Sequence, residues 1–271
     1  MYYIDTNDMN SPQRFVINKA EEFTHLSHAP ITEAVIEIRA FLESPWDEKQ
    51  VLEALKERLP EYPVSTSQKE FKQELQVDFS SETPAKQTFS DLGLKGFRFQ
   101  SSDKHCIVQF NRDGFVFGRL QPYADWQEFV REALRLWQIY SELTRPFEVP
   151  RIGLRFINRL LCPPDKQELA EYLMVVPVPP VGLNVPFTGF LHRDTLIIPN
   201  HPYGINIVKM IQPQQGFERN DLWLIIDIDV FTTEKCAASG LSIQERLEEM
   251  RWLKNKVFFG SITNSLVEVL K

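Results

Sequence analysis

The feature that most constrains the fold is the alternation of apolar and polar side chains along many short stretches of the chain. Between Glu33 and Leu42, every second residue is Ala, Ile or Leu, and Glu37 and Arg39 lie between them. Because side chains of a strand point alternately to its two sides, this pattern predicts a strand with one buried face. The same alternation predicts further strands at 71–79, 96–100, 105–110, 115–120, 151–161, 187–198, 205–212 and 222–230. Half-buried strands of this kind are typical of an antiparallel sheet.

Helical spacing of apolar residues separates these strands. It predicts helices at 47–58, 125–143, 163–172 and 243–270, the last with a break at Gly260. Asp125 and Glu128 form a capping pair for the second helix. Ser242 and Glu245 are the expected caps of the last one.

The order of the predicted elements repeats, as β-α-β-β-β-(β)-α, although no repeat is visible at the level of residues. We therefore expect an α+β fold in which two similar halves form one twisted antiparallel sheet backed by helices. Such an arrangement resembles the saddle of the TATA-box-binding protein or a helix-grip sheet. The expected organisation is an N-terminal arm (1–28), a first half (29–146) and a second half (147–271), with the halves in one globular unit.

Charge and cysteine usage bear on the kind of partner and the compartment. The chain has 271 residues, 30 basic against 37 acidic, and a net charge of −7. This balance disfavours a protein that coats nucleic acid or anionic lipid. The N-terminus has no basic and apolar leader, and no apolar stretch approaches membrane-helix length. Cys106, Cys162 and Cys236 are widely spaced, so we expect reduced, buried and inert thiols in a cytoplasmic protein.

Several segments resemble a sporadically distributed prokaryotic family of uncharacterised proteins. They are Ala29–Arg39, Asp113–Leu120 followed by Pro122, Tyr123 and Trp126, Arg151–Arg159 and Leu224–Phe231. The resemblance covers nearly the whole chain from residue 29 onward. That family has no established activity, cofactor or catalytic residues, so the resemblance implies architecture and no mechanism. The patchy distribution of the family hints at accessory defence or toxin–antitoxin systems.

A row of arginines is the most informative candidate site. Arg151, Arg155 and Arg159 share one face of a predicted strand, spaced about 6.5–7 Å apart along it, which is near the spacing of phosphates in a nucleic-acid strand. Gly153 would let a ligand approach closely. The alternative, which we favour, is a set of cross-strand ion pairs with carboxylates on the polar faces of neighbouring strands. The candidate partners are Glu33, Glu37, Asp227 and Asp229.

Asp227 and Asp229 support a second functional hypothesis. Two carboxylates on one strand face, joined by a third acidic residue such as Glu37, are the ligand type of magnesium-dependent nucleases and phosphatases. No histidine pattern, nucleophile motif or phosphate-binding loop accompanies them. The sequence therefore predicts no cofactor, and we favour a protein without catalytic activity.

Aromatic residues crowd the predicted hairpins. Phe97, Phe99, Phe110, Phe115 and Phe117 could stack nucleic-acid bases if they were exposed, but we favour a core packed against helix 125–143. Arg98, Gln109 and Arg119 would then occupy the solvent face.

The sequence thus favours a binding protein that holds a partner protein or an anionic ligand on the polar face of its sheet. Arg151, Arg155, Arg159 and Glu37 would supply polar contacts, and Tyr123 and Trp223 would be apolar anchors. A nucleic-acid-binding saddle and an enzyme using Asp227 and Asp229 remain the alternatives. No membrane partner is expected, and self-association into a homo-oligomer is left open.

Overall fold

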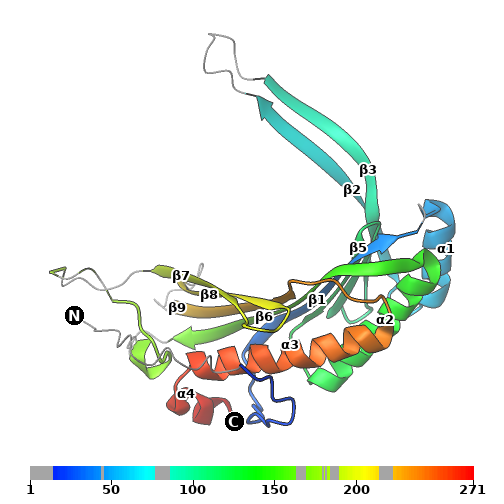
Figure 1. Cartoon of the computed structure of the whole chain (residues 1–271). Coiled ribbons are helices and arrows are strands. Elements are labelled where there is room, and N and C mark those ends of the chain that lie inside the picture. The colour runs from blue at the N-terminus through cyan, green and yellow to red at the C-terminus, as the bar shows by residue number, and fades with distance from the viewer. Residues whose placement is uncertain are drawn as a thin grey trace. The chain divides into compact units, whose positions relative to one another are not determined.

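The computed structural model describes residues 15–43, 46–76, 86–162, 169–178, 180, 182–183, 189–213 and 222–271. Its strands are β1 (Ile31–Leu42), β2 (Val64–Gln76), β3 (Lys86–Gln100), β4 (Cys106–Asn111), β5 (Gly114–Leu120), β6 (Pro146–Cys162), β7 (Phe190–Ile197), β8 (Tyr203–Pro213) and β9 (Leu222–Thr232). Its helices are α1 (Glu48–Arg58), α2 (Trp126–Thr144), α3 (Gly240–Ser261) and α4 (Asn264–Leu270), with a short 3-10 turn at Leu169–Glu171 (Figure 1).

The described strands form one nine-stranded antiparallel sheet, in the order β2-β3-β4-β5-β1-β6-β9-β8-β7. The predicted α+β class with an antiparallel sheet is therefore confirmed. The chain divides into two compact units made of discontinuous stretches. Unit 1 comprises Met1–Pro30, Asn158–Glu234 and Arg246–Lys271, and unit 2 comprises Ile31–Ile157 and Lys235–Glu245.

Aromatic packing between α2 and the hairpin β4–β5 builds the core of unit 2. The ring of Phe115 lies 6.1 Å from that of Trp137, and the rings of Phe117 and Phe129 stack at 5.4 Å. Phe97, Phe99 and Phe110 are also at most 3% exposed, so the hairpin aromatics belong to the core, as expected. Asp125 caps α2 by accepting a hydrogen bond from the amide of Glu128 at 2.7 Å.

The turn between β4 and β5 depends on a glycine. Gly114 has φ of +149°, and a Cβ there would lie 2.3 Å from the carbonyl oxygen of Ile38 on β1. Any other residue would strain the turn, and its side chain would push β5 away from β1. The predicted hairpin at this position is confirmed.

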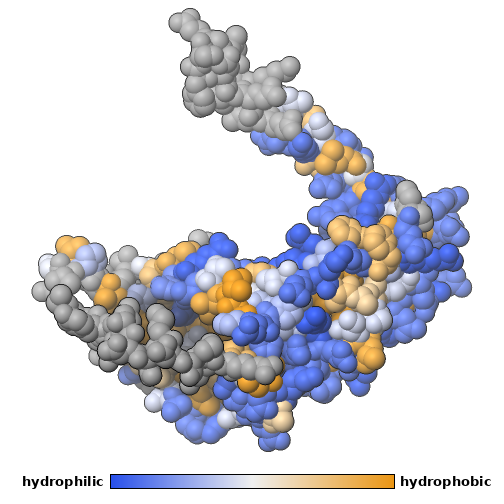
Figure 2. Space-filling view, in the orientation of Figure 1, coloured by the Kyte–Doolittle hydropathy of each residue, from blue (hydrophilic) through white to orange (hydrophobic). Residues whose placement is uncertain are grey.

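The ribbon of β2 and β3 is longer than its sequence pattern indicates. β2 begins at Val64 rather than at residue 71, and β3 begins at Lys86 rather than at residue 96. Residues 77–85 lie outside the described residues. Phe71 and Phe89 on this ribbon are 63% and 67% exposed. In Figure 2, hydrophobic residues accordingly interrupt the hydrophilic surface of the ribbon.

In unit 1, one face of β9 and the C-terminal part of α3 are buried. Ile226 and Ile228 of β9 and Leu247 and Met250 of α3 have no exposed surface. Tyr203, at the start of β8, donates its hydroxyl hydrogen to the Glu249 carboxylate of α3. This bond places α3 on the sheet face to which Tyr203 points.

The described part of the N-terminal arm packs on unit 1. The Phe15 ring lies 5.9 Å from that of Trp252, and the Phe23 ring stacks on that of Phe259 at 5.5 Å. Glu21 accepts hydrogen bonds from Trp252 at 2.9 Å and Lys256 at 2.7 Å. Residues 1–14 of the arm lie outside the described residues.

The C-terminal helix differs from the prediction at both ends. It begins at Gly240, where the hydroxyl of Ser239, rather than Ser242, accepts the hydrogen bond from an amide of the first turn. The break comes after Ser261, and Thr263 caps α4 by accepting from the amide of Leu266 at 3.2 Å. Of the helix predicted at 163–172, only the turn Leu169–Glu171 lies within the described residues. None of the helices described has the length and apolar character that crossing a membrane requires.

Replacing Phe115 by alanine should destabilise the protein by about 3–5 kcal/mol, because it removes a fully buried ring and leaves a cavity beneath α2. The free energy of unfolding, measured by urea denaturation, is the test. Phe89→Ala is the matched control, since its ring is exposed, and it should change that free energy little. Equal losses for the two variants would contradict this account of the core.

Candidate functional site

The strand β6 places the three predicted arginines as the alternation indicates. Arg155 and Arg159 are exposed and Arg151 is half-buried, while Ile152, Leu154, Phe156 and Leu160 between them are buried. Asn158 lies among the buried residues, where its side-chain amide donates to the carbonyl oxygen of Ile226 at 2.9 Å.

Arg151 forms an ion pair within unit 2. Its guanidinium donates to the carboxylate of Glu37, which also accepts from Arg39 at 3.3 Å. A Cβ at position 153 would lie 3.0 Å from the Arg151 Nη1 atom and 3.6 Å from the Glu37 Oε2 atom. Gly153 therefore makes room for this ion pair rather than for a ligand. The partly exposed pair contributes at most about 1 kcal/mol to stability.

Arg159 has a different environment, in unit 1. Its guanidinium carbon lies 4.0 Å from the centre of the Trp223 ring, in a cation–π arrangement. Trp223 belongs to β9, directly opposite Gln212 of β8. The guanidinium thus lies over the indole ring while the arginine remains exposed.

The residues beside Trp223 form ordered rows across β7, β8 and β9 on the sheet face opposite to Tyr203. Leu191, Met210 and Ile225 pair in one row, Arg193, Val208 and Asp227 in the next, and Thr195, Asn206 and Asp229 in the third. In the third row, Thr195 donates to Asn206 at 3.0 Å and Asn206 donates to Asp229 at 3.4 Å. We call these rows, with Trp223 and Arg159, the open face of unit 1.

The open face is partly hydrophobic. Leu191 is 69% exposed, while Met210, Ile225 and Trp223 are half-buried. Trp223 was predicted as an apolar anchor of the site, whereas Leu191 and Met210 were not predicted. The sequence does contain a sign of both residues. They are apolar side chains at positions where the alternation of β7 and β8 predicts polar ones.

The predicted metal alternative lacks a third ligand in the described part of the chain. There, no group of three or more His, Cys, Asp or Glu side chains lies close enough to hold a metal ion. Glu37, the suggested third acid, is engaged by Arg151 and Arg39 instead.

Tyr123 lies apart from the arginines that it was expected to accompany. Its ring makes edge contacts with Phe156 of β6 at 5.6 Å and with Phe129 of α2 at 5.8 Å. Since Phe156 is on the buried side of β6, Tyr123 belongs to the helix-covered face of unit 2 and not to the face that carries Arg155.

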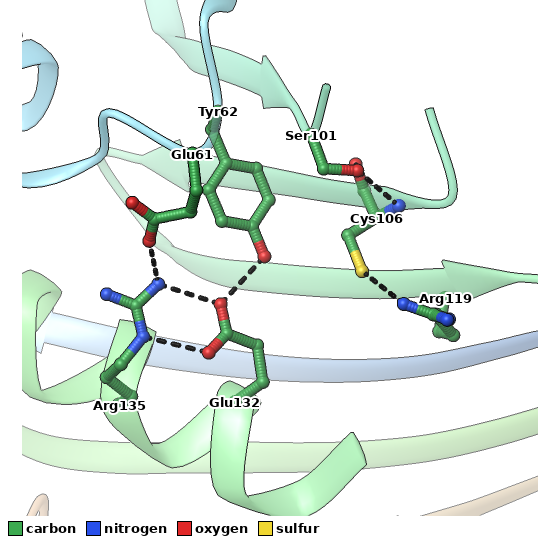
Figure 3. A network of polar contacts seen from close by, with 7 residues as sticks. All are labelled: Glu61, Tyr62, Ser101, Cys106, Arg119, Glu132 and Arg135. Carbon is green, nitrogen blue, oxygen red and sulfur yellow. Dashed lines mark hydrogen bonds and ion pairs between the residues drawn. The ribbon is translucent and has the colours of Figure 1, made fainter. Parts of the chain in front are cut away.

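A second polar cluster, shown in Figure 3, lies under α2 in unit 2. Arg135 donates to Glu132 at 2.7 and 2.8 Å and also pairs with Glu61, and Tyr62 donates to Glu132 at 2.8 Å. Burial raises the pKa of Glu132, but the hydrogen bonds from Arg135 and Tyr62 outweigh it and hold the pKa below its usual value. Burial and the charge of Glu132 raise the pKa of Tyr62, which is thus a hydrogen-bond donor and no base. The cluster ties the segment after α1 to α2.

Cys106 lies beside this cluster, and its surroundings correct the prediction for Arg119. Arg119 shares the face of Phe115 and Phe117 on β5 and points inward, where it donates to the Cys106 Sγ atom at 3.2 Å. The hollow at this place has a volume of about 30 Å³, room for about one water molecule. It is too small for a substrate, so this cluster is structural.

Cys106, Cys162 and Cys236 form no disulfide bond, in agreement with the prediction of reduced thiols. Cys106 and Cys162 are buried, whereas Cys236 is half-buried. Burial raises the pKa of the Cys162 thiol to about 11, which keeps it protonated at neutral pH.

The comparisons with known proteins add no relative. The chain matches no family model, no curated protein and no solved structure.

Replacing Glu132 by glutamine should lower the free energy of unfolding by about 1–3 kcal/mol at pH 7, because it removes the charge that Arg135 and Tyr62 bind. The folded-state pKa of Glu132 is lowered, so its contribution is fully present above pH 4.5, the usual value. It is lost as the pH falls through the lowered value. The difference between wild type and variant should therefore shrink with acidification, as measured by urea denaturation at several pH values.

Glu142→Gln is the control on the same helix, because Glu142 pairs with Arg58 in an exposed position. It should have little effect on stability. A Glu132→Gln loss that does not change between pH 7 and pH 3 would show that the lost interaction is not that of a carboxylate.

Proposed function

We propose that the protein is a binding component that holds a partner protein on the open face of unit 1. The observation that carries this proposal is the Arg159 guanidinium stacked at 4.0 Å on Trp223, beside the apolar row of Leu191, Met210 and Ile225. Tryptophan and arginine are the residue types that most often dominate the binding energy of protein interfaces. An apolar centre with polar residues around it is also the usual anatomy of such an interface.

The polar rows favour a protein over nucleic acid as the partner. Asp227 and Asp229 lie on the same face as Arg159, and their carboxylates would repel a phosphate backbone. The net charge of −7 acts in the same direction. Because Arg151 is paired with Glu37, fewer arginines of the row on β6 are available to bind the phosphates of a nucleic acid.

The stacking on Trp223 has an energetic consequence for binding. A long arginine side chain normally loses rotamer freedom when it becomes fixed in an interface. Arg159 already lies on the indole, so less freedom remains to be lost on association. A carboxylate of the partner could accept two parallel hydrogen bonds from the planar guanidinium.

We also infer that the fold consists of two similar halves, as the order of predicted elements suggests. In the sheet order, β1 lies next to β5 and β6 lies next to β9. The opening strand of each half is thus adjacent to the last strand of the same half, which supports a common plan. A saddle-like or helix-grip-like sheet remains part of this proposal.

Photo-crosslinking in an extract of the native host tests the proposed face. With p-benzoylphenylalanine in place of Leu191, one partner protein should be captured and identified by mass spectrometry. With the same group in place of Val269, which is 74% exposed on α4, that protein should be absent. Capture of the same proteins from both positions, or of nucleic acid from position 191, would overturn the proposal.

Once the partner is purified, Arg159→Ala should weaken its binding at least tenfold in calorimetric titration, because the stacked guanidinium is lost. Arg58→Ala is the control, since Arg58 pairs with Glu142 in unit 2. Equal affinities of the two variants would show that the Arg159–Trp223 pair does not contribute to the interface.

A further inference from the structure

A groove in unit 2 lies between α2 and the start of α3. It has a volume of about 610 Å³, within the range of about 300–1,000 Å³ that is typical of small-molecule sites. One wall is a stripe of α2, formed by Arg131, Leu134, Arg135, Gln138 and Ser141. Ala238, Ser239, Gly240 and Gln244 form the other wall.

The two walls are held together by a buried tryptophan. Trp137 of α2 is 1% exposed, and its indole nitrogen donates to the carbonyl oxygen of Ala238 at 3.3 Å. With Leu134, the Trp137 ring gives the groove an apolar part. An apolar body of a ligand would find its contacts there.

The charge of the groove is positive. Its described lining includes two arginines and no carboxylate. Arg135 is engaged by Glu132 and Glu61. Arg131 is exposed and forms no hydrogen bond or ion pair with the described residues, so it is the cation available to a ligand.

Polar groups of the groove are left without partners. The Ser141 hydroxyl oxygen is buried and has no hydrogen-bond partner in the described structure. Because this oxygen atom is buried, it is closed to a ligand in the groove and is not counted among the binding groups. On the other wall, the Ser239 hydroxyl and carbonyl accept from the amides of Ser242 and Ile243. The two preceding amides, of Gly240 and Leu241, are donors that the helix itself cannot satisfy.

We propose that this groove binds a small organic anion, with a carboxylate or phosphate head on an apolar body. Arg131 binds the head, and the amides at the start of α3 favour its negative charge. The apolar body lies against Leu134 and Trp137. This proposal is independent of the partner proposed for the open face, because the two sites share no residue.

Phenyl phosphate is the first probe, and the indole N–H signal of Trp137 in a nitrogen-15 NMR spectrum is the readout, assigned with Trp137→Phe. We expect a saturable shift of this signal at millimolar probe. Phenylacetate, which carries the carboxylate head, should shift the same signal, whereas benzyl alcohol, which has the ring and no charge, should not. Inorganic phosphate should bind more weakly than phenyl phosphate, because it lacks the apolar body.

Arg131→Gln should weaken the binding of phenyl phosphate at least tenfold. Arg98→Gln removes the same charge from β3, outside the groove, and should leave the affinity unchanged. The spectra also show whether each variant is folded. No saturable shift with either anion, or an equal loss of affinity in Arg131→Gln and Arg98→Gln, would overturn the proposal.

Discussion

The constraint on which this structure depends is the burial of one side of each central strand beneath a helix. Phe115 and Phe117 on β5 and Ile226 and Ile228 on β9 have almost no exposed surface, because α2 and α3 lie over those sides of the sheet. The alternating side chains between them must then point the other way. On β9 these are the residues of the open face, which are half-buried: Trp223, Ile225, Asp227 and Asp229.

The positions of strands and helices were predicted well from the sequence where one face of the element is apolar. The strands at β1, β4, β5 and β9 and the helix α2 were located within a few residues, because their alternation or helical spacing reports burial directly. Prediction failed for the outer part of the ribbon, at 64–70 of β2 and 86–95 of β3. Phe89 in this region and Phe71 beside it are exposed, so burial imposes no period on the sequence there, unlike at Phe97 and Phe99. The fold of such a ribbon is set by pairing between strands, which a single strand does not encode.

Prediction of the candidate site was limited in the same way, because contacts between strands are not encoded in the pattern of one strand. Period-two spacing correctly put Arg151, Arg155 and Arg159 on one face of β6, but it contains no information about what lies on the next strand. The ion pair of Arg151 with Glu37 is one of the expected cross-strand pairs, whereas only the structure shows that the Arg159 guanidinium lies over Trp223. Arg119 illustrates the opposite error. Because it is charged, Arg119 was predicted to lie on the solvent face of β5. It lies on the inner face instead, where the Cys106 sulfur accepts a hydrogen bond from its guanidinium.

Polar clusters of this fold differ in how completely their side chains are hydrogen-bonded to one another, and this difference underlies the proposal for the groove. Around Glu132, the side chains of Arg135, Tyr62 and Glu61 are all engaged in hydrogen bonds or ion pairs with one another or with Glu132. This cluster therefore connects elements of the fold and leaves no group for a ligand. In the proposed groove, by contrast, Arg131 is exposed and forms no hydrogen bond or ion pair with the described residues. A cation next to an apolar surface is the arrangement in which a ligand gains both polar and hydrophobic contacts. The extent to which polar groups are already paired, more than residue type, therefore separates the structural cluster from the proposed binding groove.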